Sequence, residues 1–278
     1  MSSSPRSLPE HPSSRDVRPI ETARDIIATA GRNIDRILAA PHPEVRPSGN
    51  ATQRRRTARR LARHYRPALL GAVASPDSRR AAFAMIYPIG PNAGNVEGLA
   101  VFQESHHLDA DVTAQGIPLE RTPAAHVDVH AISRLIERRQ VIDLAGVTRA
   151  LSPALGWSLA AQHVGLKGTF FLPDPQGMFA CERAPYIADG RGAPIVRIKT
   201  YIHQEGMSAF HRAARQVLLE TCEALDAPRI PSLSGVSADH AAALNRMREI
   251  GHQWERRRAG VDRNFAPLAS ARELTPQS

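Results

Sequence analysis

The sequence predicts an α+β fold in which helices pack on an antiparallel sheet, with helical additions at the N- and C-terminal ends. Three observations lead to this class. Segments with apolar residues at helical spacing lie toward both ends of the chain, and segments of alternating apolar and polar residues lie in the middle. Short links rich in Gly, Pro and Asn join neighbouring strands, which is typical of antiparallel hairpins. At 278 residues, the chain can bury a core that needs no disulfide.

Composition and periodicity divide the chain into five expected regions. These are a disordered Ser/Pro-rich leader over residues 1–18, a helical N-terminal region over 19–75, an α+β core domain over 80–226, a C-terminal helix over 236–258 and a flexible tail over 259–278. The leader has no hydrophobic period, so it cannot offset the entropy that ordering would cost.

Two helices are predicted in the N-terminal region. The first covers residues 19–40, because Pro19 suits a first helical turn and isoleucines recur at helical spacing before a Pro-rich break. The second begins near Asn50 or Thr52 and is dense in arginine. Its arginines are Arg54, Arg55, Arg56, Arg59, Arg60, Arg63 and Arg66, around a thin apolar set of Leu61, Leu69 and Leu70. Such a run is either a solvated face or an arm that binds phosphates.

A hairpin and a polar loop are expected next. The strands cover residues 81–89 and 97–103, and the turn formers of GPNAGN join them. The segment ESHHLDADV, residues 104–112, follows as a polar loop.

The central stretch AAHVDVHAISRLIERR, residues 124–139, predicts a strand that enters a helix. His126, Asp128 and His130 alternate with valines, so a period of two places them on one face of a strand. In the helical half, His130, Arg134 and Arg138 recur at i, i+4 and i+8 beside an apolar stripe. This cationic row is suited to hold phosphate oxygens.

The remaining elements follow from the same signals. Asp143 can cap a helix that ends near Pro153 or extends to Val164. A second hairpin has strands at residues 169–172 and 178–182 around the turn PDPQG. Two packing helices close the fold, over residues 207–225 and 237–257.

The clearest strand is predicted over residues 195–203. Its odd positions are Arg197, Lys199, Tyr201 and His203, and alternation would project all four from one face. This face is either the polar outer side of an antiparallel sheet or an active face that stabilises charge on phosphorus and moves protons.

The charge balance favours an anionic partner, nucleic acid first. The formal net charge is +9 and the pI is near 10.6. The two cysteines, Cys181 and Cys222, are too few for a disulfide framework, so a reducing compartment is expected. With no apolar run of about 18 residues, we expect no membrane partner and a cytoplasmic location, with delivery into a target cell left open.

From His130 to His203 the order of features resembles the barnase, EndoU, colicin and RelE (BECR) nuclease fold of toxin-like modules. Members open with a helix of the type H-x-x-x-R-x-x-x-R and continue into a sheet whose late strand carries a Thr-containing run. The matching pieces are HAISRLIERR, with His130, Arg134, Glu137 and Arg138, and IVRIKTYI with Thr200.

This resemblance implies a metal-independent endoribonuclease that cleaves RNA by attack of the 2′-hydroxyl on the adjacent phosphate, without a cofactor. His130 would be base or acid, with His203 or His126 as its counterpart. The implied catalytic residues are His130, Arg134, Arg138, Lys199, Tyr201 and His203, and the expected RNA-binding residues are Arg55, Arg59, Arg63 and Arg197. A neutralising protein partner, as toxins of this kind have, stays open.

Two other hypotheses stand beside the nuclease. His126, Asp128 and His130 on one strand face could ligate the metal of a hydrolase. Alternatively, the chain is a non-enzymatic basic protein with a nucleic-acid-binding or regulatory role. Its arginines would then only contact phosphates.

Overall fold

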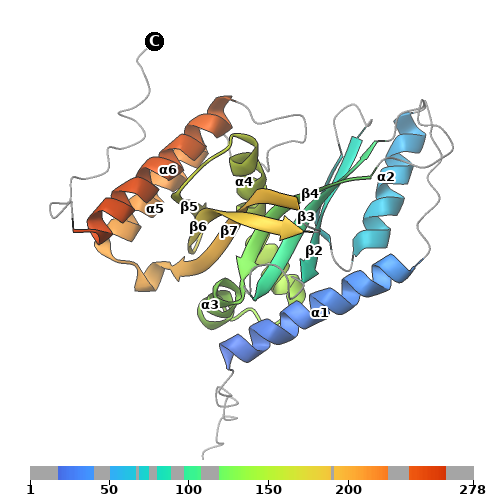
Figure 1. The fold of residues 1–278 in the computed structure, drawn as a ribbon, viewed down its shortest axis with the longest axis horizontal. Coiled ribbons are helices and arrows are strands. Elements are labelled where there is room, and N and C mark those ends of the chain that lie inside the picture. Colours follow the sequence, from blue (N-terminus) through green and yellow to red (C-terminus); the bar gives the residue numbers. More distant parts are fainter. Residues whose placement is uncertain are drawn as a thin grey trace, which may run out of the picture.

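The structure is a computed structural model that describes residues 18–40, 51–66, 69–74, 80–88, 97–107, 119–188, 191–224 and 238–260. Its elements are α1 (Pro19–Ala39), α2 (Ala51–Tyr65), β1 (Leu69–Ala74), β2 (Arg80–Pro88), β3 (Gly98–His107), β4 (Leu119–Asp128), α3 (Val129–Arg139), α4 (Leu144–His163), β5 (Thr169–Asp174), β6 (Gly177–Ala188), β7 (Arg191–His203), η2 (Gln204–Gly206), α5 (Ala209–Ala224) and α6 (Ala238–Arg258). Helices packed on a sheet confirm the α+β class (Figure 1).

The strands of the described segments form one seven-stranded sheet in the order β1-β2-β3-β4-β7-β6-β5. All neighbours are antiparallel except β4 and β7, which pair in parallel. The expectation of a purely antiparallel sheet is therefore wrong at this one junction. Two antiparallel meanders, β1 to β4 and β5 to β7, meet there after the chain crosses through α3 and α4, and a helical crossover of this kind permits a parallel pair.

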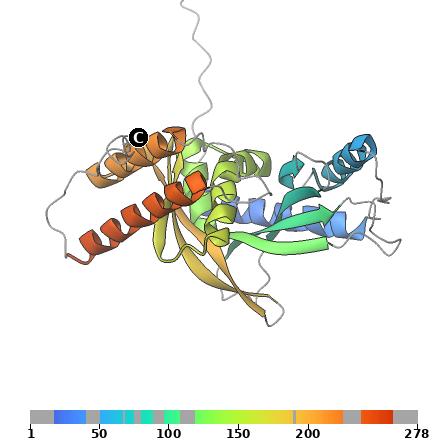
Figure 2. The same ribbon diagram turned by 90° about the horizontal axis from the view of Figure 1, so that it is seen from above.

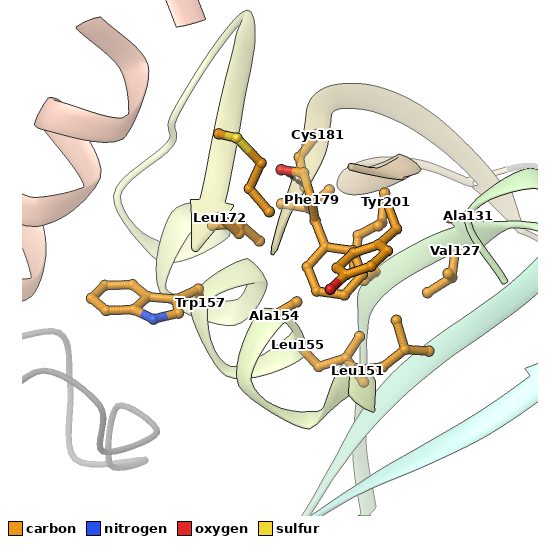
Figure 3. Packing of buried hydrophobic residues seen from close by; sticks show 14 of the residues in the cluster. Val127, Ala131, Leu151, Ala154, Leu155, Trp157, Leu172, Phe179, Cys181 and Tyr201 are labelled. Carbon is orange, nitrogen blue, oxygen red and sulfur yellow. Dashed lines mark hydrogen bonds between the residues drawn. The ribbon is translucent and has the colours of Figure 1, made fainter. Parts of the chain in front are cut away.

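The main hydrophobic core lies on one face of the sheet. Val127, Ile198 and Cys181 are register partners on β4, β7 and β6, so their side chains share a face. All three are buried in a cluster that includes residues of α1, α3 and α4. In Figure 3, Leu151 and Leu155 of α4 lie in this cluster together with Val127.

The helices α5 and α6 pack around the other meander, at strand β5. Gly251 of α6 permits a close approach to the edge strand, because a Cβ there would lie 1.8 Å from the carbonyl oxygen of Thr169. The ring of Trp254, also on α6, lies 4.5 Å from the ring of His211 on α5 and 6.5 Å from that of Phe171 on β5. The helix α2 lies at the opposite end of the molecule from α5 and α6 (Figure 1, Figure 2).

Most predicted elements are confirmed, including both hairpins and the passage from β4 into α3. Helix α4 continues past Pro153, and the carboxylate of Asp143 accepts a hydrogen bond from the Gly146 amide at 2.7 Å, as a cap does.

Two predicted elements need correction. The arginine-rich helix ends at Tyr65, so Leu69 and Leu70 belong to strand β1 and not to its apolar face. The first residues of the expected polar loop, 104–107, continue strand β3, where they pair with β2 and β4. Residues 108–112 of that loop, the GPNAGN turn, the leader before Arg18 and the tail after Gly260 lie outside the described residues.

Candidate nucleic-acid interface

A line of charged side chains crosses the sheet where its two meanders join. The register pairs His126 of β4 with Arg197 of β7, and Arg197 with Glu182 of β6, so these side chains share the face opposite the main core. The Arg197 guanidinium donates two hydrogen bonds to the Asp128 carboxylate, from Nε to Oδ1 at 2.9 Å and from Nη2 to Oδ2 at 2.8 Å. Its Nη1 lies 3.4 Å from Oε1 of Glu182, and Lys199 Nζ donates to Oε2 of Glu182 at 2.9 Å.

The buried end of this line is His126. Its Nδ1 lies 3.4 Å from Oδ1 of Asp128, while its Nε2 is buried without a hydrogen-bond partner. A Cβ at Gly98 would lie 2.4 Å from Nε2, so only glycine leaves room for this ring. Burial lowers the pKa of His126 to about 4, helped by the charge of Arg197 and opposed by Asp128. The imidazole is therefore neutral near pH 7.

Exposure rises along the line, from 6% of the His126 side chain to 46% of the Lys199 side chain. The charges within it balance, because two carboxylates face one guanidinium and one ammonium. This arrangement joins β4 to β7 and β6 by ion pairs and leaves Lys199 as its exposed end.

The sequence predicted that the four odd-numbered side chains of β7 project from one face. They do not, because the strand contains a β-bulge. Cys181 pairs with Ile198 but Ala180 pairs with Thr200, so Lys199 is an extra residue in β7. Beyond it, alternation is reversed. Tyr201 consequently lies in the core beside Phe179, with ring centroids 5.0 Å apart (Figure 3).

Tyr201 is part of a second polar group, centred on the buried carboxylate of Asp174 at the end of β5. The carboxylate accepts hydrogen bonds from the Tyr201 hydroxyl at 3.1 Å, from Nη1 of Arg139 at 3.1 Å and from the Gln176 amide at 2.9 Å. Arg215 of α5 donates to the carbonyl oxygens of Asp174 and Pro175. Burial raises the pKa of Tyr201, and Asp174 adds to the rise, so this phenol is a hydrogen-bond donor and not a proton source.

The predicted cationic row of α3 lies on the surface of that helix. His130 is exposed, and it belongs to α3, not to the strand that carries His126 and Asp128. Arg134 and Arg138 both contact the carboxylate of Glu137, at 2.7 Å and 3.1 Å. Their charges are thus partly neutralised within the helix.

The proposed nuclease residues therefore occupy three places. Lys199 and Arg197 lie on one face of the sheet, whereas α3, with His130, Arg134 and Arg138, packs on the other. Tyr201 is in the core on the α3 side, and His203 follows it at the end of β7, where its Nδ1 accepts from the Glu205 amide at 3.4 Å. The structure does not bring this set together on a common surface.

The residues of the metal hypothesis are also divided, because His130 starts a helix while His126 and Asp128 lie at the end of β4. In the described part of the chain, no group of three or more His, Cys, Asp or Glu side chains is arranged to hold a metal ion. Likewise, none of its helices is both long and apolar enough to cross a membrane.

In the described part of the chain, helix α2 carries a surface with basic residues and no acidic ones. Seven of the 36 basic residues and none of the 27 acidic ones lie in residues 51–66, so the rest, with 29 basic and 27 acidic, is nearly neutral. The exposed positions of this segment are Thr52, Gln53, Arg56, Arg59, Arg60, Arg63 and Arg66, and Leu61 is fully buried. We call these five arginines the α2 stripe. The predicted RNA-binding residues Arg59 and Arg63 belong to it; Arg55 is in α2, but its side chain is outside the described set.

Sequence reasoning missed Glu182 and Asp174, the carboxylates that hold Lys199, Arg139 and Tyr201. A signal for Asp174 existed, since an Asp before Pro and Gly is a turn former whose carboxylate can accept a backbone amide. Glu182 offered none, because only the strand register shows that it faces Arg197.

In comparisons with protein-family models, with curated proteins and with solved structures, nothing matches this chain.

Proposed function

We propose that the protein binds nucleic acid through the α2 stripe, which contacts phosphate oxygens. The observation that carries this proposal is the concentration of seven positive charges, with no carboxylate, in one sixteen-residue segment whose five described arginines are all exposed. Arginine is suited to this task because its planar fork donates two parallel hydrogen bonds to a phosphate.

Pairing elsewhere in the molecule supports this choice of surface. Cations around the sheet are engaged by carboxylates, as in Arg24 with Glu97, Arg139 with Asp174 and Arg197 with Asp128. Within the described residues, no ion pair is found for any arginine of the α2 stripe. A phosphate at this stripe therefore displaces no ion-pair partner among the described residues, and binding releases the counterions that each phosphate held.

The test is to measure the affinity of the full chain for labelled DNA and RNA after two charges of the stripe are removed. We expect Arg59→Gln with Arg63→Gln to weaken binding roughly tenfold, since each phosphate contact adds to affinity. The matched control is Arg32→Gln with Arg36→Gln, which removes two exposed charges from α1. Equal weakening by both pairs, or no binding by the unmodified protein, would contradict the proposal.

RNA cleavage is a second candidate, and one observation favours it. His126 is neutral and a carboxylate faces its Nδ1, an arrangement that fixes the imidazole of a general base, although its Nε2 is buried beside Gly98. Lys199, expected to be catalytic, and Arg197, expected to bind RNA, lie on the same face of the sheet.

This second candidate is tested with total RNA in the presence of a strong chelator. Metal-independent cleavage predicts activity that survives the chelator and is lost in His126→Gln. His211→Gln is the control, because His211 is also buried with an unpartnered Nε2 but lies between α5 and α6. Absence of cleavage, or equal loss in both variants when both are folded by circular dichroism, removes cleavage from consideration.

A further inference from the structure

We infer that the occupant of the α2 stripe is the phosphate backbone of B-form duplex DNA, met in its major groove. This inference rests on the proposed nucleic-acid binding and narrows its ligand.

The stripe covers a single side of the helix. At about 100° per residue, Arg56, Arg59, Arg60 and Arg63 fall within an arc of about 100°, Leu61 lies nearly opposite its centre, and Arg66 follows directly after the end of α2. Leu61 is fully buried, and α2 packs on β1 and β2. The helix is thus fixed to the sheet on one side and presents arginine on the other.

The stripe is also suited in length to span several phosphates. At 1.5 Å per residue, Arg56 and Arg63 lie about 10 Å apart along the helix axis, with Arg59 and Arg60 between them and Arg66 directly after the end of the helix. Duplex DNA carries one negative charge per about 1.7 Å of its axis, so each arginine side chain has a phosphate within reach.

The composition of the stripe disfavours single strands as the main ligand. Proteins that bind single-stranded nucleic acid stack bases on aromatic side chains, and each stacked base contributes about 1–3 kcal/mol. The exposed residues of α2 that the structure describes are arginine, threonine and glutamine, without an aromatic ring. They can contact phosphates, and without aromatic rings they offer unpaired bases only guanidinium planes on which to stack.

The dimensions favour DNA over an RNA duplex. An α-helix with its side chains is about 10–12 Å across, which matches a B-form major groove about 12 Å wide, whereas the A-form groove is too narrow to admit it. The helix α2 lies at one end of the molecule (Figure 1, Figure 2), and β1 and β2 are its main packing partners among the described elements.

The experiment compares the affinities of the full chain for four labelled ligands of equal length: duplex DNA, duplex RNA, single-stranded DNA and single-stranded RNA. We expect duplex DNA to bind roughly tenfold tighter than each of the others, a difference of about 1.4 kcal/mol. This preference should shrink in Arg59→Gln with Arg63→Gln and persist in Arg32→Gln with Arg36→Gln.

The outcomes distinguish the assignment to B-form DNA from the proposal that α2 binds nucleic acid. Equal or tighter binding of a single strand, or of duplex RNA, overturns the assignment to a B-form groove while nucleic-acid binding through α2 stands. If none of the four ligands binds, both proposals fall. A duplex preference that Arg59→Gln with Arg63→Gln leaves unchanged places the DNA on another surface and overturns the role of the stripe.

Discussion

At the scale of single residues, alternation predicted correctly that Arg197 and Lys199 share a face, but it could not supply their partners. Asp128 and Glu182 lie 69 and 17 positions away from them in sequence and are brought close only by strand register. Alternation also failed at Tyr201, because one extra residue in β7 reverses the faces that follow it. Local pattern thus specifies a side of a strand but not the residues that meet there.

His126 should make the folded protein sensitive to acid. Its pKa is about 4 in the folded protein but near the ordinary 6.5 in an unfolded chain. As pH falls from about 6.5 to about 4, His126 is therefore protonated in the unfolded state but not in the folded state. The free energy of unfolding falls by roughly 3 kcal/mol over this range. Above that window the residue contributes no pH dependence.

Urea unfolding between pH 7 and pH 4 measures this effect. His126→Gln should flatten part of the pH dependence, and His211, whose pKa burial also lowers, should account for a further part. His130→Gln is the control, because this side chain is exposed at the start of α3. A His126→Gln profile parallel to that of the unmodified protein would mean that His126 takes up its proton equally well when buried.

Asp174 should matter for stability more than any exposed carboxylate. Asp174→Ala removes the acceptor of Arg139, Tyr201 and the Gln176 amide, and leaves a buried hydroxyl unsatisfied, so we expect a loss of about 3 kcal/mol. Asp143→Ala, which removes only the cap of α4, should cost about 1 kcal/mol. Denaturant midpoints measured on both variants test this order, and equal losses would show that the Asp174 contacts add nothing beyond a cap.

At the scale of elements, periodicity predicted most helices and strands because amphipathic segments bury their apolar side locally. The sequence did not predict where α2 ends, because Leu69 and Leu70 extend the apolar set of this helix. In the structure, Leu69 pairs with β2 and so belongs to the sheet. The parallel junction of β4 and β7 was missed for a related reason. Hairpin turns are visible in the sequence, but the pairing of strands far apart is decided by the whole fold.

That junction should depend on the pair of Arg197 and Asp128. Replacing Arg197 by Met leaves a buried carboxylate without its guanidinium and should cost about 3 kcal/mol. Adding Asp128→Leu removes the uncompensated charge, so the double variant should recover most of the loss. Unfolding free energies of the two single variants and the double variant form the cycle, and additive losses would show that the two residues are not coupled.

At the scale of the whole molecule, the net charge predicts an anionic partner but does not predict which surface would bind it. The sequence showed the arginine-rich helix and left open whether it was only solvated. The structure adds that its described arginines form one exposed side, opposite Leu61. The residues of the expected nuclease site show the converse. The sequence pattern grouped them into one site, but in the structure they lie on two sides of the sheet.

The salt dependence of DNA binding is the most direct measurement of the central claim, that the α2 stripe binds phosphates. For five contacts, the logarithm of the affinity should fall with the logarithm of salt concentration with a slope of about −4.5, or about −0.9 per phosphate. Arg59→Gln with Arg63→Gln should reduce the slope by about 1.8, whereas Arg32→Gln with Arg36→Gln should leave it unchanged. A slope that stays the same in the α2 variant would contradict the account.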